Sequence, residues 1–176
     1  GVNVCGIEVR VCGFFEMNFN IRKTKLEDMA GVMDAHRRSI LELCSKDYRP
    51  EQIQAWANVN YSKDIWQRNI ELEFHYVIER EKQIEGFCHS RIHDDGTGEI
   101  KGLYFTKKIS GLGLGRKVFE LCMRHIYERN CPTVLITATK TAKGFYEKMG
   151  FRIVQEAVIP IRGIEVECFR MEMVLK

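Results

Sequence analysis

A glycine-rich turn between a predicted strand and a predicted helix is the feature that most constrains how this chain can fold. It runs from Phe105 to Arg116 and carries glycines at three alternate positions, Gly111, Gly113 and Gly115. Glycine lets a backbone turn sharply and approach a ligand closely. The N–H groups that begin the following helix would point at an anion, and the helix dipole would strengthen the attraction. The segment therefore predicts a site for a pyrophosphate, without naming the nucleotide.

Two familiar nucleotide-binding motifs do not fit this turn. A P-loop requires Gly-Lys followed by Ser or Thr, whereas Gly115 is followed by Arg116 and Lys117. A Rossmann site expects an acidic residue at the end of the next strand, and residues 137–140 at the end of that strand contain no carboxylate. A plain connecting turn remains the alternative for this segment taken alone.

Hydrophobic periodicity on both sides of the turn predicts an ordered series of strands and helices. Thr24 and Glu27 have the form of a capping box, and helical patterns follow it as far as residue 66. The predicted strands are residues 19–23, 74–79, 83–92, 98–105, 133–138, 151–159 and 165–175, with helices over about 113–129 and 141–149. This order predicts an α/β or α+β sandwich around a mixed sheet.

Composition argues against several classes of protein. The 176 residues suit one domain, for which we take residues 19–176; residues 1–18 are then an N-terminal extension in which Met17 is a candidate natural start. The net charge is only +3 without a Lys/Arg block, so nucleic acid is not expected as a partner. Seven scattered cysteines without a CxxC pair indicate reduced thiols in a cytoplasmic protein rather than disulfides or a zinc site. No membrane span is expected, because no apolar stretch is long enough.

Two segments resemble the GNAT superfamily of N-acetyltransferases. Ala142-Lys143-Gly144-Phe145-Tyr146-Glu147-Lys148-Met149-Gly150-Phe151 is similar to the A-x-x-F-Y-E-K-x-G-F segment of that family. Upstream, residues 99–105 and the glycine turn resemble the family's fourth strand and its Q/R-x-x-G-x-G/A loop. Both occur in the family's order, over about residues 98–151. This chain departs from the pattern with Ser110 where the loop usually begins with Gln or Arg, and with Thr139 where Asn is common.

The resemblance implies a GNAT-like single domain whose central sheet is mixed, mostly antiparallel and twisted, with flanking helices. It also implies acetyl-CoA as co-substrate. No metal is expected, because the sequence shows no metal-ligand spacing. The strand backbone would pair with the pantetheine arm, and the amides of the turn would hold the pyrophosphate. The cofactor-binding residues that it implies are Leu103, Tyr104, Phe105, Ser110, Gly111, Leu112, Gly113, Leu114, Gly115, Arg116, Thr139 and Lys143.

Acetyl transfer to an amine needs a base, because an amine resembling that of lysine has a pKa of about 10.4. The resemblance suggests Glu99, although a carboxyl with a pKa of about 4.3 would need burial or a relaying water. The alternative for Glu99 is a solvated strand carboxylate. Tyr146 is the candidate acid, because a phenol with a pKa of about 10 stays protonated near neutral pH and can donate to a leaving thiolate. Its alternative role is packing against Phe145 and Phe151.

Other reactive residue types have simpler interpretations. Cys122 lies on the apolar stripe of a predicted helix, and Cys88 sits in a strand without an evident base, so both are expected in the core rather than as nucleophiles. His89 and His93 share one face of a strand, but no third ligand accompanies them. We interpret them as ordinary residues, or as residues that face the substrate, rather than as metal ligands.

The sequence thus predicts an N-acetyltransferase that moves the acetyl group of acetyl-CoA directly to an unidentified amine. We expect the acceptor pocket to involve residues 35–66 and the last strands, with a small-molecule acceptor favoured over a protein. The terminal strands offer an edge for a homodimer. The alternative function is a catalytically degenerate acetyl-CoA-binding sensor or scaffold, which Ser110 and Thr139 favour and Glu99 and Tyr146 disfavour.

Overall fold

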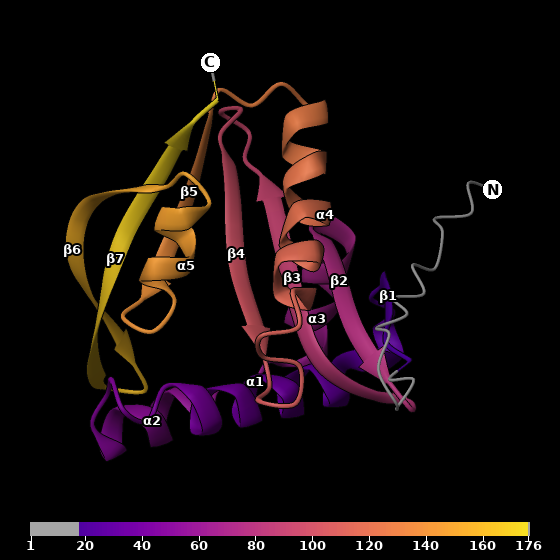
Figure 1. Cartoon of the computed structure of the whole chain (residues 1–176), viewed down its shortest axis with the longest axis vertical. Helices are drawn as coiled ribbons and strands as arrows, with labels where there is room; N and C mark the ends of the chain where they lie inside the picture. Colours follow the sequence, from indigo (N-terminus) through magenta and orange to yellow (C-terminus); the bar gives the residue numbers. More distant parts are fainter. Residues whose placement is uncertain (1–17, 176) are drawn as a thin grey trace.

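The computed structural model describes residues 18–175, which form one seven-stranded sheet with helices on both faces (Figure 1). The predicted N-terminal extension lies outside the described residues, except for Asn18. The strands are β1 (Asn20–Lys23), β2 (Phe74–Arg80), β3 (Gln83–Ile92), β4 (Gly98–Phe105), β5 (Thr133–Thr139), β6 (Arg152–Ile161) and β7 (Ile164–Val174). Their order across the sheet is β1-β2-β3-β4-β5-β7-β6, and only β4 and β5 pair in parallel. The predicted mixed, mostly antiparallel sheet is confirmed.

Helix α4 covers one face of this sheet because its apolar side chains repeat with helical period. The helices are α1 (Met29–Leu43), α2 (Pro50–Ala57), α3 (Lys63–Leu72), α4 (Leu114–Glu128) and α5 (Lys143–Lys148), with a short 3₁₀ helix before α1. Val118, Cys122 and Ile126 of α4 are fully buried against strand residues such as Ile100 and Ile136. Burying one such aliphatic side chain stabilises a fold by roughly 1.5–3 kcal/mol. None of the helices within residues 18–175 is long and apolar enough to cross a bilayer.

Helix α1 packs on the opposite face of β3 and β4. Successive strand residues point to opposite faces, so Cys88 belongs to the α4 core whereas Phe87 packs with Val32 of α1. The rings of His89 and Tyr104 contact Phe87 and therefore lie on the α1 face. Each strand in the middle of the sheet thus separates an apolar core from a more polar layer.

The two halves of the sheet are joined at its centre by a short parallel ladder. Residues 98–100 of β4 pair with residues 134–136 of β5. Beyond these pairs β4 continues to pair with β3 as far as Phe105, and β5 continues with β7 as far as Thr139. The strands β4 and β5 therefore diverge after Ile100, as Figure 1 shows.

Two local features differ from what residue patterns predict. The turn between β2 and β3 consists of Glu81 and Lys82 in left-handed conformations, with φ of 49° and 65°, although such turns favour Asn and Gly. The predicted capping box of Thr24 with Glu27 is wrong. The Thr24 hydroxyl instead forms a 2.7 Å hydrogen bond with Nδ1 of His75, because tertiary contact offers it a buried partner.

Candidate active site

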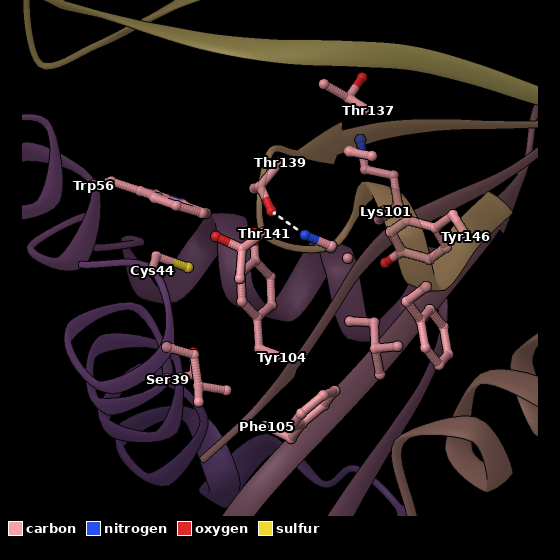
Figure 2. Close-up of a pocket in the computed structure, with 16 residues that line it drawn as sticks. Ser39, Cys44, Trp56, Lys101, Tyr104, Phe105, Thr137, Thr139, Thr141 and Tyr146 are labelled. Carbon is pink, nitrogen blue, oxygen red and sulfur yellow. Dashed lines mark hydrogen bonds between the residues drawn. The ribbon is translucent and has the colours of Figure 1, made fainter. Parts of the chain in front are cut away.

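A cavity of about 130 Å³ opens where β4 and β5 diverge (Figure 2). Strand β4, strand β5, helix α5 and the helices α1 and α2 all contribute to its walls. The lining residues include Leu103, Tyr104 and Phe105 of β4, Thr137, Ala138 and Thr139 of β5, Phe145 and Tyr146 of α5, Ser39 of α1 and Trp56 of α2. Side chains that are far apart in the sequence therefore surround one space at the break in the sheet.

The edge of β4 that faces this cavity carries unpaired backbone groups. Residues 98–100 pair with β5, whereas residues 102–105 pair only with β3, on the other side of the strand. An extended ligand can add to such an edge like another strand and exchange backbone hydrogen bonds with it. The structure thus brings the predicted residues Leu103, Tyr104 and Phe105 to one open strand edge.

The glycine turn leads into the N-terminus of α4. Gly111 and Gly113 adopt left-handed φ values of 78° and 76°, which strain any residue with a side chain. Gly113 is the N-cap of α4 and has no side chain to satisfy the first helical N–H groups. Those groups have no partner within a helix, so the amides of Leu114, Gly115 and Arg116 can bind an anion. Within the turn, the amides of Ser110 and Leu112 form long hydrogen bonds of 3.4 Å to backbone carbonyls, so the start of the helix provides the available donors.

A buried carboxylate fixes the start of the turn. Glu85 is 1% exposed and accepts hydrogen bonds from Thr106 Oγ1 at 2.6 Å and from Arg38 Nη1 at 2.8 Å. The backbone N–H of Thr106 also donates to the carbonyl of Glu85, at 2.8 Å. Burial raises the pKa of Glu85, but the hydrogen bonds from Thr106 and Arg38 outweigh it, so this pKa lies below its ordinary value. Thr106, at the start of the turn, is therefore bonded to Glu85 of β3 and linked through it to Arg38 of α1.

Tyr146 points from α5 into the cavity (Figure 2). The residue is 3% exposed, and its ring packs against Phe145 and Phe151. Burial, with smaller contributions from neighbouring ionisable groups, raises the pKa of Tyr146 well above 10, so its hydroxyl keeps its proton at neutral pH. The geometry is compatible both with proton donation and with packing, the two roles expected from the sequence.

Glu99 does not line this cavity. Its Oε1 lies 3.2 Å from Nζ of Lys101 and 3.5 Å from Nε2 of His93, and its side chain is a quarter exposed. The structure therefore places Glu99 in a cluster of charges close to solvent. Its role as the base stays a prediction.

The remaining predicted binding residues are spread around the cavity and the turn. Thr139 lines the cavity, and its hydroxyl accepts a 3.1 Å hydrogen bond from the amide of Ala142 (Figure 2). Arg116 forms an ion pair one turn along α4, and Lys143 lies over an aromatic ring of β7 rather than in the cavity wall. Within the turn, Ser110 and Leu112 are exposed, as are its glycines Gly111 and Gly113. What these side chains bind stays a prediction.

A second cavity, of about 290 Å³, lies on the α1 face, and Lys101 and Tyr104 line both cavities. The polar side chains around it come from α1, α3, β2, β3 and β4 and from the segments between them. They are His36, Tyr61, Asn69, Glu73, His75, His89, Arg91 and Lys101. The expected acceptor region, residues 35–66, supplies part of this wall. Glu73 and His75 were missed, because residue patterns do not reveal which side chains of neighbouring elements converge on a cavity.

Two histidines of this cavity are kept neutral by burial. Burial, with a smaller electrostatic contribution from His89, lowers the pKa of His36 to about 4. The same causes lower the pKa of His75 well below its ordinary value. Among residues 18–175 no three His, Cys, Asp or Glu side chains come together in a way that could hold a metal ion. The absence of a metal cofactor stays a prediction.

Comparison with known proteins identifies the class to which this fold and site belong. The model of the Acetyltransferase (GNAT) domain matches residues 44–175. The chain therefore belongs to the GNAT acetyltransferase family, whose members are acyltransferases, and the resemblance found in the sequence is confirmed.

Solved structures and a curated relative agree with this family. A GCN5-related N-acetyltransferase from Rhodopseudomonas palustris superposes with a TM-score of 0.79 over 93% of this chain and 100% of its own, at 21% identity. The PaiA N-acetyltransferase from Thermoplasma acidophilum, solved in complex with coenzyme A, superposes with a TM-score of 0.72 over 90% of this chain and 99% of its own, at 19% identity. A mycothiol acetyltransferase from Thermomonospora curvata is 29% identical over 79 residues, which cover 43% of this chain and 27% of that protein. The match thus spans about a quarter of the length of that relative.

Proposed function

We propose that this protein is an N-acetyltransferase that transfers the acetyl group of acetyl-CoA directly to an amine of a small molecule. The observation that carries this proposal is the divergence of β4 and β5 after Ile100. It leaves an unpaired strand edge along a cavity into which the Tyr146 hydroxyl points. Membership of the acetyltransferase family supports the same class of reaction.

The residues present fit coenzyme A. An extended pantetheine arm suits the open edge of residues 103–105, and a diphosphate suits the backbone amides of residues 110–115 at the start of α4. At Gly115 an added Cβ would come within 2.9 Å of the Phe105 ring, so only glycine lets this helix start so close to the strand. Arg116, Thr139 and Lys143 are proposed as further contacts. When bound, acetyl-CoA supplies an acetyl group already activated as a thioester.

Acetyl transfer requires an acid for the sulfur, a donor for the carbonyl oxygen and a base for the amine. Tyr146 holds a proton on Oη at neutral pH and is proposed as the acid for the departing sulfur. A backbone N–H of residues 103–105 is proposed to polarise the carbonyl oxygen under attack. Glu99 stays a candidate base, although Lys101 and His93 already pair with its carboxylate.

The second cavity is proposed as the acceptor site. It shares Lys101 and Tyr104 with the first cavity, so a molecule within it would lie next to the open edge of β4. Its volume of about 290 Å³ lies near the lower end of the range of small-molecule sites. Its several polar side chains suit an amine that carries other polar groups.

The test is thiol release from acetyl-CoA with a panel of small amines, comparing the wild type with Tyr146→Phe. We expect an amine to stimulate release, and the variant to keep its acetyl-CoA affinity while kcat falls by about 100-fold or more. Tyr127→Phe is the matched control, because Tyr127 lies 53% exposed on α4, and it should retain the wild-type rate. Tight acetyl-CoA binding without stimulation by any amine would favour the sensor or scaffold alternative. Absence of acetyl-CoA binding would refute the proposed function.

A homodimer through β6 is part of the proposal. This strand lies at the edge of the sheet, where unpaired backbone groups favour pairing with another chain. It also exposes four aliphatic side chains: Ile153, Val154, Val158 and Ile159. Light scattering after size exclusion should show a dimer that Val158→Lys converts to a monomer, and a monomeric wild type would exclude this arrangement.

We also propose a cytoplasmic location. Five cysteines in the part of the chain that the structure describes are buried free thiols, namely Cys44, Cys88, Cys122, Cys131 and Cys168. Burial raises the pKa of Cys88 well above its ordinary value, which makes that thiol unreactive. Free thiols are typical of reducing compartments. Fractionation of cells that express the protein would test the location.

A further inference from the structure

The two ring nitrogens of His89 have different surroundings in the second cavity. Nδ1 lies 2.5 Å from Oε2 of Glu73, whose side chain is only 2% exposed. Because a carboxylate in its ionised form accepts hydrogen bonds and cannot donate them, we assign the proton of this hydrogen bond to Nδ1. In the neutral ring Nε2 then has a free lone pair. Within residues 18–175, no hydrogen bond to this Nε2 is formed.

This lone pair lies next to the strand that faces both cavities. His89 of β3 pairs with Gly102 of β4. A Cβ built on Gly102 would lie 3.1 Å from Nε2 of His89 and 2.7 Å from the Tyr104 ring. Gly102 immediately precedes residues 103–105, the open edge proposed to hold the thioester end of acetyl-CoA. Nε2 of His89, which lines the second cavity, therefore lies beside Gly102, which lines the first.

The other two imidazoles of the cavity are unsuited to take a proton. His36 has a pKa of about 4 because it is buried, and a base this weak is inefficient near neutral pH. His75 uses Nδ1 in its hydrogen bond with Thr24, and burial keeps it neutral. His89 differs from both because a carboxylate is available to stabilise its protonated form.

The charges that face His89 come from every element packed around it. Glu73 is the only carboxylate among the described residues that line the cavity, and it follows α3. Two cations of the lining oppose a further positive charge, Arg91 on β3 and Lys101 on β4, and Glu99 pairs with Lys101. The uncharged titratable groups around the ring are His36 on α1, Tyr61 before α3, His75 on β2 and Tyr104 on β4.

We propose that His89 is the base that deprotonates the acceptor amine, and that Glu73 is a positioning residue that fixes its tautomer. This inference rests on the proposed function. Nε2 of His89 takes one proton from the ammonium form of the acceptor, and the freed nitrogen lone pair forms the C–N bond while the C–S bond breaks. The sulfur takes the proton of Tyr146 Oη, which is replaced by the second proton of the amine nitrogen. His89 then releases its proton to solvent.

The first arm of the test compares His89→Gln with His93→Gln in thiol release, with an amine selected from the panel. We expect His89→Gln to lower kcat/KM by about 10²–10⁴-fold and to abolish the acid limb of its pH profile, with unchanged acetyl-CoA affinity. The loss should shrink with an aromatic amine, which is already unprotonated at neutral pH. His93→Gln should keep the wild-type profile.

The second arm reads the positioning role without acetyl-CoA. Long-range ¹H–¹⁵N spectra of the histidine rings should show His89 as the Nδ1–H tautomer in the wild type, and a mixture of tautomers in Glu73→Gln. The same variant should lower kcat more than it raises KM, and should move the acid limb to lower pH, because the imidazolium loses its carboxylate partner. A merely structural role for Glu73 would leave the limb in place.

The outcomes separate this inference from the proposed function. If His89→Gln keeps the acid limb while the wild type turns over acetyl-CoA, His89 is not the base and the function stands. Loss of the limb in Glu99→Gln, with its retention in His89→Gln, would assign the base to Glu99. An Nε2–H tautomer in the wild type would overturn the orientation by Glu73. If no amine stimulates thiol release by the wild type, the function fails and the base fails with it.

Discussion

One histidine–carboxylate pair joins His89 of β3 to Glu73, and another joins His93, just after β3, to Glu99 of β4; their surroundings make them chemically different. In the inner pair, Nδ1 of His89 lies 2.5 Å from Glu73, and the two side chains are 16% and 2% exposed. In the outer pair, Nε2 of His93 lies 3.5 Å from Glu99, and the exposures are 37% and 25%. Glu99 also contacts Lys101, whereas Glu73 forms no other described ion pair. The inner pair lines the proposed acceptor cavity, and the outer pair does not.

This difference shows why residue type alone does not identify a base. Exposed ion pairs contribute about 0–1 kcal/mol and are screened by salt, so the outer pair is expected to matter little. Burial and a single short hydrogen bond give the inner pair a fixed tautomer and a free lone pair in a cavity.

Among changes to the surroundings of the two pairs, the largest effect is expected from Gly102→Ala, which displaces His89 of the inner pair together with Tyr104. The added Cβ would meet the Tyr104 ring at 2.7 Å and Nε2 of His89 at 3.1 Å, so both side chains must move. Displacement of a reacting group by about 1 Å can lower a rate by about 100-fold, and we expect a loss of this size in kcat. Gly144→Ala is the control, because a Cβ at Gly144 meets nothing within 4 Å. A wild-type kcat in Gly102→Ala would show that the position of His89 does not matter.

The fold itself was predictable because local patterns reflect it directly. The apolar stripe of α4, with Val118 and Cys122, and the glycine turn before it were visible in the sequence and correspond to the observed elements. Tyr146 was found because its segment resembles a family motif, and the structure places it at a cavity. Such features depend on residues close together in the chain.

The inner pair was not predictable, because it depends on strand register. A shift in register between His89 and Ser90 leaves Lys101 without a partner on β3 and sets Gly102 opposite His89. A shift of one residue changes which side chains share a face of the sheet, and the local sequence contains no pattern that indicates this shift. The contact with Glu73 further requires the end of α3 to meet β3. The sequence therefore suggested a substrate-facing histidine among other interpretations, but not its partner.

Acid should lower the free energy of unfolding through buried histidines such as His36. The pKa of His36 is about 4 in the folded protein, against an ordinary 6.5. Because the folded value is depressed, the unfolded chain binds the proton first, so stability present above pH 6.5 is lost as the pH falls toward 4. Protonation of His36 in the unfolded chain should by itself lower the free energy of unfolding by about 2 kcal/mol between pH 7 and pH 5, measured by urea denaturation. His36→Phe should reduce this slope, to which His75 also contributes, and His93→Gln should keep it. An unchanged slope in His36→Phe would assign it to other groups.

The two carboxylates should also differ in what they contribute to stability. Glu73→Gln weakens a buried hydrogen bond to a charged group, and we expect it to lower the free energy of unfolding by about 1.5 kcal/mol. Glu99→Gln removes a partly exposed pair and should cost about 0.5 kcal/mol, an effect that added salt reduces further. Urea denaturation of both variants at low and high salt measures the difference. Equal losses with equal salt dependence would show that burial does not distinguish the pairs.

A smaller effect than that of Glu73→Gln is expected from Thr24→Val, which removes a support that the outer pair lacks. The Thr24 hydroxyl bonds to Nδ1 of His75 at 2.7 Å, and the ring of His75 lies 4.8 Å from that of His89. Valine has nearly the same shape but leaves Nδ1 of a buried ring without a partner, so about 1 kcal/mol of stability should be lost. Thr133→Val is the control, since the described structure contains no hydrogen bond from that hydroxyl, and it should change stability by less than about 0.5 kcal/mol.

In Thr24→Val the tautomer of His75 should shift in the ¹H–¹⁵N spectrum while that of His89 is retained, because Glu73 still holds it. If the His89 tautomer changes as well, the ring of His75 and not Glu73 alone sets the orientation of the base.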